Sequence, residues 1–189
     1  MNQDPIFIKA GERLLEYLRG ELVPTVLGTP DMIKLAYPGQ EEEFRLGLFL
    51  YDMEEVRPHG PPGMTRLSED SRRFPDLSLA MRFMAFANRK VAFHSMEMAD
   101  ELLMMEGVFR AVHGSSGLEL DGQKLKLRFY PLTQGEKVSL WQSLGSPLQG
   151  AVYFTLEPIP VPSSRIQRIP PVRAVEIHAN HEERRPGAL

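Results

Sequence analysis

An alternation of apolar and other side chains in the middle of the sequence predicts a β-strand. The alternating apolar positions are Leu77, Leu79, Met81, Phe83 and Ala85. Successive side chains of a strand point to opposite sides, so this spacing gives the strand one buried face. A strand needs neighbours for its backbone hydrogen bonds, and the rest of the chain is therefore expected to supply a sheet.

Four other segments have the composition or the alternation of strands. They span residues 32–37, 44–51, 124–129 and 151–161. Segment 44–51 is apolar at both odd and even positions, which is typical of a strand inside a sheet. In segment 124–129 apolar residues alternate with three cationic ones, which predicts one buried and one cationic face.

Two further segments carry clear signals for the start of a helix. An Asp-Pro pair at residues 4–5 precedes a helical pattern over residues 6–22, since aspartate caps free N–H groups and proline already has a helical φ. Thr133 and Glu136 have the spacing of a capping box and predict a short third helix. We expect that helix to bury Trp141 against the sheet.

The longest predicted helix spans about residues 91–113 and ends before Gly114. An apolar stripe at helical spacing predicts its buried face. The stripe consists of Val91, Ser95, Met98, Leu102, Met105, Phe109 and Val112. Glu97, Asp100 and Glu101 lie on one helix, whereas paired catalytic carboxylates must oppose each other across a cleft. We therefore expect these three acids on the solvated face of the helix.

The order of these elements predicts an α/β fold of the α+β type, with a mixed sheet of about five strands covered by helices. We assign residues 1–162 to this single domain and residues 163–189 to a polar C-terminal extension. Residues 52–76 contain prolines and glycines without periodicity, so we expect a projecting, unstructured loop there.

Composition narrows the classes of function. The formal net charge is −3, which argues against a nucleic-acid binder, since such proteins usually have a strongly basic face. The chain has no cysteine, so nothing requires an oxidising compartment. No segment has the length of apolar sequence that a membrane span needs. A cytoplasmic protein is the simplest interpretation.

Motifs for catalysis or cofactor binding are not found in the sequence. Neither the spacing of a phosphate-binding P-loop nor that of a dinucleotide site occurs. Glu176, His178, His181 and Glu182 are residue types that bind zinc, but they fall in the polar extension, where no packed surroundings would orient them. We therefore expect no cofactor, no metal and no enzymatic activity.

Lys124, Lys126 and Arg128 form the cationic row of the strand at 124–129. Two hypotheses account for this row. It is either a solvated strand face or a contact for an acidic partner.

Residues 124–159 carry a family resemblance. Their recognisable elements are Pro131-Leu132, Thr133 with Glu136, Leu140-Trp141, Leu144-Gly145 and Val152-Tyr153. This segment resembles the C-terminal half of a domain in cap proteins of contractile injection systems, of the antifeeding-prophage and virulence-cassette type. Upstream, residues 48–55, 77–87 and the long helix match in order, so that the resemblance spans about residues 6–161.

The resemblance implies a non-enzymatic cap, or terminator, of a phage-tail-like particle. Such a protein forms a ring of copies of itself, expected to be a hexamer, that ends the inner tube and couples it to the sheath. It implies assembly in the cytoplasm, with no nucleic-acid partner and no membrane span. The residues that we expect at contacts with the tube and sheath are Lys124, Lys126, Arg128, Arg57, His59, Met64 and Arg66.

Two alternatives remain at the level of sequence. The chain is either another structural component of such a particle, from the baseplate or from tube initiation, or a small soluble ligand-binding module or enzyme. A ring seen by microscopy favours a particle component, and a monomer with a deep polar pocket favours the second alternative.

Overall fold

The fold class predicted from the sequence, a mixed sheet covered by helices, is confirmed by the computed structural model. The structure describes residues 5–56, 63–68, 70–90 and 97–168. It divides into two compact units. The first contains Met1–Pro61 and Asp76–Pro162, and the second contains Pro62–Pro75 and Ser163–Leu189.

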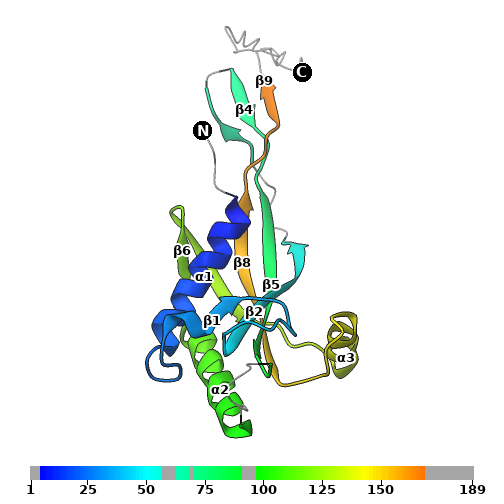
Figure 1. Ribbon diagram of the computed structural model, residues 1–189. Coiled ribbons are helices and arrows are strands. Elements are labelled where there is room, and N and C mark those ends of the chain that lie inside the picture. The colour runs from blue at the N-terminus through cyan, green and yellow to red at the C-terminus, as the bar shows by residue number, and fades with distance from the viewer. Residues whose placement is uncertain (1–4, 57–62, 69, 91–96, 169–189) are drawn as a thin grey trace, which may run out of the picture. The chain divides into compact units, whose positions relative to one another are not determined.

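The first unit is built on a six-stranded sheet with the order β1-β2-β5-β8-β7-β6 (Figure 1). Its strands are β1 (Ile33–Leu35), β2 (Leu46–Glu55), β5 (Leu77–Ala87), β6 (Leu118–Leu120), β7 (Gln123–Phe129) and β8 (Ala151–Val161). β1 runs parallel to β2, and the other neighbouring strands are antiparallel. The expectation of about five strands missed β6, which is too short to show an alternation.

Helices α1 (Ile6–Leu22) and α2 (Met98–Gly114) cover one face of this sheet. α1 has the predicted bounds, and its leucines Leu14 and Leu18 are fully buried. They pack in one cluster with Phe83 of β5 and Phe154 of β8, whose rings stack with centroids 6.0 Å apart. Burial of this apolar surface is the main force that holds the helices on the sheet.

α2 buries only part of the predicted stripe, since Met105 and Val112 are buried and other members are not. Its fully or largely buried apolar residues are Met104, Met105, Val108, Ala111 and Val112. Met98, Leu102 and Phe109 of the predicted stripe are exposed instead, and Val91 and Ser95 lie outside the described residues. α2 is apolar on more than one side, so that periodicity alone did not select the side that meets the sheet.

Glu101 of α2 was expected in solvent but is buried. Arg89 makes this possible, because its guanidinium donates to both carboxylate oxygens of Glu101, the shortest distance being 2.8 Å. A buried carboxylate requires such a paired and hydrogen-bonded partner.

α3 (Gln134–Ser143) packs on the opposite face of the sheet. Its predicted capping box is confirmed, since the Thr133 hydroxyl accepts from the Glu136 N–H while the Glu136 carboxylate accepts from the Thr133 N–H. Trp141 is 1% exposed, as predicted, and its indole N–H donates to the hydroxyl of Tyr153 at 2.9 Å. Figure 1 shows α3 beside one end of β8.

The second unit contains a three-stranded sheet with the order β3-β4-β9. Its strands are β3 (Thr65–Arg66), β4 (Ser71–Arg73) and β9 (Ile166–Arg168). The expectation of an unstructured loop at residues 52–76 is therefore wrong in part, because β2 extends to Glu55 and two short strands follow. β4 gains its partner β9 from beyond Pro162, a pairing that local sequence does not signal.

Candidate assembly interface

The predicted cationic row lies on β7, and all three of its side chains are exposed. Acidic residues on the neighbouring strands accompany it: Glu119 faces Lys124, and Glu157 faces Lys126. The Arg128 Nε atom lies 3.4 Å from a carboxylate oxygen of Glu157. The positive charge of the row is therefore compensated in part within the chain.

Arg82 of β5 is the centre of a polar cluster on the same sheet face. Its guanidinium donates to Asp52 at 2.8 Å and also contacts Glu54, both on β2. Its Cζ atom lies 4.0 Å from the ring centroid of Tyr130, a cation–π distance. The sequence did not identify this cluster, and its only signal was one charged residue, Arg82, inside a largely apolar strand.

Tyr51 of β2 borders this cluster. Its ring meets that of Tyr153 edge to face, with centroids 6.1 Å apart. The Tyr51 hydroxyl is buried and has no hydrogen-bond partner among the described residues. Burial raises the pKa of Tyr51 well above its ordinary value, because the charged phenolate is poorly solvated there.

The edge of the sheet beyond β2 is only partly covered. β1 faces β2 from Leu46 to Leu48, after which the Ala36 N–H donates to the Leu48 carbonyl. The chain then turns away from β2. In the described part of the chain, no strand pairs with residues 50–55 on that side.

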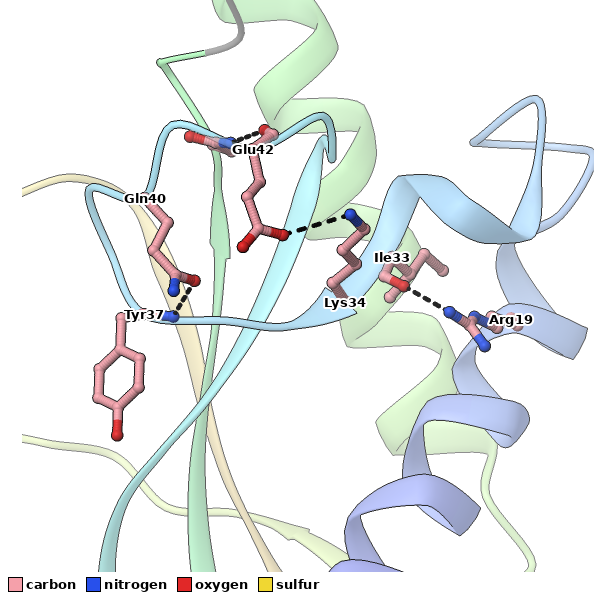
Figure 2. Close-up of polar contacts among 7 residues, drawn as sticks. Arg19, Ile33, Lys34, Tyr37, Gln40 and Glu42 are labelled. Atoms are coloured by element: carbon pink, nitrogen blue, oxygen red, sulfur yellow. Dashed lines mark hydrogen bonds and ion pairs between the residues drawn. The ribbon is translucent and has the colours of Figure 1, made fainter.

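Hydrogen bonds fix this turn of the chain (Figure 2). Arg19 of α1 donates to the carbonyl of Ile33 at 2.9 Å, and Lys34 lies 3.3 Å from the carboxylate of Glu42. Beyond β1, the side-chain oxygen of Gln40 accepts from the Tyr37 N–H at 2.9 Å. Contacts within β1 and just beyond it thus fix the path of the chain where β1 ends.

An apolar pocket of about 470 Å³ lies beside residues 48–50 of β2, where the pairing with β1 ends. It is lined by α1, by β1 with the residues that follow it, and by β2 and β5. The lining includes Ile8, Leu35, Tyr37, Phe49 and Leu50. Ile8, Leu35 and Tyr37 are 56%, 45% and 62% exposed, which is unusual for large apolar side chains grouped around one hollow.

The opposite edge of the sheet carries an exposed aromatic pair. Phe129 of β7 and Phe109 of α2 have ring centroids 5.2 Å apart, and their side chains are 40% and 49% exposed. β6 faces β7 only from Gln123 to Leu125. Among the described residues, no strand covers Lys126–Phe129 on that side.

The remaining predicted contact residues belong to the loop before β5. Met64 is 40% exposed and Arg66 is exposed on β3, so both are accessible within the second unit. Arg57 and His59 lie outside the described residues. Four further arginines of this unit were not predicted as contact residues: Arg72, Arg73, Arg165 and Arg168. They come from segments far apart in the chain, so that their proximity had no local signal.

In the described ranges, no group of three or more histidines and carboxylates could hold a metal ion. The predicted zinc-type residues Glu176, His178, His181 and Glu182 lie outside those ranges. No helix of the part that the structure describes is both long and apolar enough to cross a membrane.

Comparison with known proteins identifies one family and solved structures of similar fold. The model of the Pvc16 N-terminal domain family matches residues 11–174, whereas no curated protein matches. One similar structure is the sheath/tube terminator of PVC, an extracellular contractile injection system, with 18% identity, a TM-score of 0.66 and coverage of 100% of this chain and 66% of the other. The tube-terminating cap of the anti-feeding prophage has 16% identity and a TM-score of 0.63, with coverage of 94% and 62%. The chain thus spans less than two thirds of either protein, and at these identities the likeness concerns the fold.

Proposed function

The chain belongs to the Pvc16 N-terminal domain family, and from this premise we propose that it is a terminator subunit that caps the inner tube of a contractile, phage-tail-like particle. In this role copies of the chain form a ring on the end of the tube and connect it to the sheath. Particles of this kind assemble inside the producing cell, and the ring is expected to be a hexamer.

One observation carries the proposal. The likeness in fold covers 100% of this chain for a solved sheath/tube terminator and 94% of it for a solved tube-terminating cap. Two such proteins with one fold make a terminator a better assignment than a baseplate or tube-initiation component.

The distribution of surface features supports the same role. Exposed large apolar side chains occur at both edges of the sheet, on α2 and in the second unit, among them Tyr37, Phe129, Leu102 and Ile166. Surfaces of this kind suit contacts between proteins. We therefore propose a structural and non-enzymatic subunit.

The arginines of the second unit suit an acidic surface on the tube or sheath. Met64 and Arg66 belong to this unit, as do Arg165 and Arg168. Electrostatic complementarity speeds docking and selects the partner. We assign the contact with the tube or sheath to this unit.

Deletion of the gene in a producing cell tests the proposed function. Without a terminator nothing stops tube growth, so electron micrographs of purified particles should show overlong tubes of variable length. Re-expression of the wild-type chain should restore one uniform length.

Two results would contradict the assignment. Tubes of unchanged and uniform length in the deletion strain would show that the chain does not end them. Complete loss of tubes would instead indicate a component of the baseplate or of tube initiation.

A further inference from the structure

The two open edges of the sheet lie at the same level along the strands. Asp52 of β2 faces Arg82, Arg82 faces Thr155, and Thr155 faces Arg128 of β7. Residues that face each other across a sheet share one side of it. Asp52 and Arg128 are thus the two ends of one row that crosses four strands.

The open edges carry opposite charges. The open part of β2 has the exposed acids Asp52, Glu54 and Glu55, and the open part of β7 has the exposed cations Lys126 and Arg128. Two identical edges would repel each other, whereas unlike edges of two copies attract. This charge pattern favours a head-to-tail contact over a two-fold symmetric one.

The strand directions fit such a contact. β2, β5, β8 and β7 alternate in direction, because each neighbouring pair is antiparallel. β7 of one copy therefore runs antiparallel to β2 of a second copy that has the same orientation. Antiparallel strands join edge to edge without a change in the orientation of either copy.

The helix side of the sheet offers a matching apolar contact. Leu50 faces Phe83, Phe83 faces Phe154, and Phe154 faces Phe129, so Leu50 and Phe129 also end one row. Leu50 lines the apolar pocket at its end of the row. The Phe109–Phe129 pair lies at the other end of the row. It is exposed and apolar, and it lies at the level along the strands that would let it enter the pocket of a second copy.

We propose that copies of this chain join head to tail, with Lys126–Phe129 of one copy pairing with residues 50–55 of the next. Arg128 then lies beside Asp52 on the α3 side, and the two phenylalanines pack against the pocket at Leu50 on the helix side. This inference rests on the proposed function, in which a ring requires one repeated contact. A head-to-tail contact produces a ring when its rotation closes.

The proposed contact also provides an acidic partner for the cationic row. For Lys126 and Arg128 that partner is the neighbouring copy, not the tube. Lys124 already faces Glu119 on β6 and has no part in this contact.

A cysteine pair tests the contact directly, because the natural chain contains no cysteine. In Asp52→Cys/Arg128→Cys the two thiols of one chain are three strand spacings apart, roughly 14 Å. A disulfide needs Cα atoms within about 7 Å, so only a bond between copies can form. The protein is examined in purified particles and as purified protein, by mild oxidation and non-reducing electrophoresis.

The double variant should give a ladder of covalent oligomers that ends at the closed ring. The single variants Asp52→Cys and Arg128→Cys are the matched controls, and a head-to-tail contact leaves them monomeric on the gel. A double variant that stays monomeric in both settings, with thiols that still react with a maleimide, overturns the proposed contact. If particle tubes are nevertheless capped, the terminator function stands. If the chain is missing from particles but the purified protein gives the ladder, the contact stands and the terminator function fails.

Charge reversal provides a second test that needs no disulfide. Lys126→Glu/Arg128→Glu makes both edges acidic, and Glu54→Lys/Glu55→Lys makes both edges basic. Each variant alone should be monomeric by light scattering at concentrations where the wild type associates, and an equal mixture of the two should recover the association. The control Lys9→Glu/Arg13→Glu makes the same charge change on α1 and should associate as the wild type does. Association of each reversed variant by itself would refute the edge pairing.

Discussion

Two tyrosines in contact show how the surroundings of a hydroxyl set its contribution to stability. The Tyr153 hydroxyl accepts the indole N–H of Trp141. The Tyr51 hydroxyl, which is buried next to it, has no hydrogen-bond partner among the described residues. A buried polar group without a partner costs free energy, whereas a bonded one contributes about 1 kcal/mol.

We predict opposite effects when each hydroxyl is removed. Tyr153→Phe should lower the free energy of unfolding by about 1 kcal/mol, because the buried indole N–H loses its acceptor. Tyr51→Phe should leave that free energy unchanged or raise it. Urea unfolding of the two variants and the wild type at neutral pH checks both. A larger loss in Tyr51→Phe than in Tyr153→Phe would contradict this description.

The same two residues illustrate what sequence reveals at the residue scale. Burial of Trp141 followed from its place in a capped helix with an apolar face. Its bond to Tyr153 did not, since the partner lies on another element. Glu101 was misplaced for the same reason, because only the fold shows that Arg89 lies within reach of it.

At the scale of elements, the buried face of α2 was predicted only in part. The predicted stripe through Met98, Leu102 and Phe109 has regular helical spacing, yet these side chains are 69%, 62% and 49% exposed. The sheet buries Met104, Val108 and Ala111 together with Met105 and Val112 of the predicted stripe. A helix that is apolar on two sides has one face free for another contact.

Matched substitutions on α2 distinguish these two sides. Leu102→Lys should change the free energy of unfolding by less than about 0.5 kcal/mol, as surface substitutions usually do. Val108→Lys should prevent folding or lower the stability by more than about 3 kcal/mol, since it places a charge in the core. Thermal unfolding followed by circular dichroism measures both. Equal destabilisation by the two changes would contradict the exposure of Leu102 and would support the stripe predicted from the sequence.

Strands with a long alternation were predicted well, whereas among the short ones only β1 was predicted. β5 and β8 lie where the alternation placed them, at residues 77–87 and 151–161. β6 and the strands of the second unit have three residues or fewer, which is too short for a pattern. These short strands exist because a neighbouring strand supplies their hydrogen bonds.

At the scale of the whole molecule, the sequence supplied the fold class and the family resemblance, and the family is now established by the match over residues 11–174. The sequence did not supply the way in which copies meet. Lys126 and Arg128 were recognisable as a cationic row, but their acidic counterparts on β2 lie more than 70 positions earlier in the chain. Only the register of the sheet places the two sets at opposite edges and at one level.

The proposed function and the proposed contact together predict a closed ring of this chain at the end of a tube. Cryo-electron microscopy of purified particles tests that prediction most directly. We predict a single ring at the tube end distal to the baseplate, with each six-stranded sheet fitting the density and β7 of one copy beside β2 of the next. Density for the chain at the baseplate end, or tube ends without it in particles of normal length, would contradict the proposed terminator function.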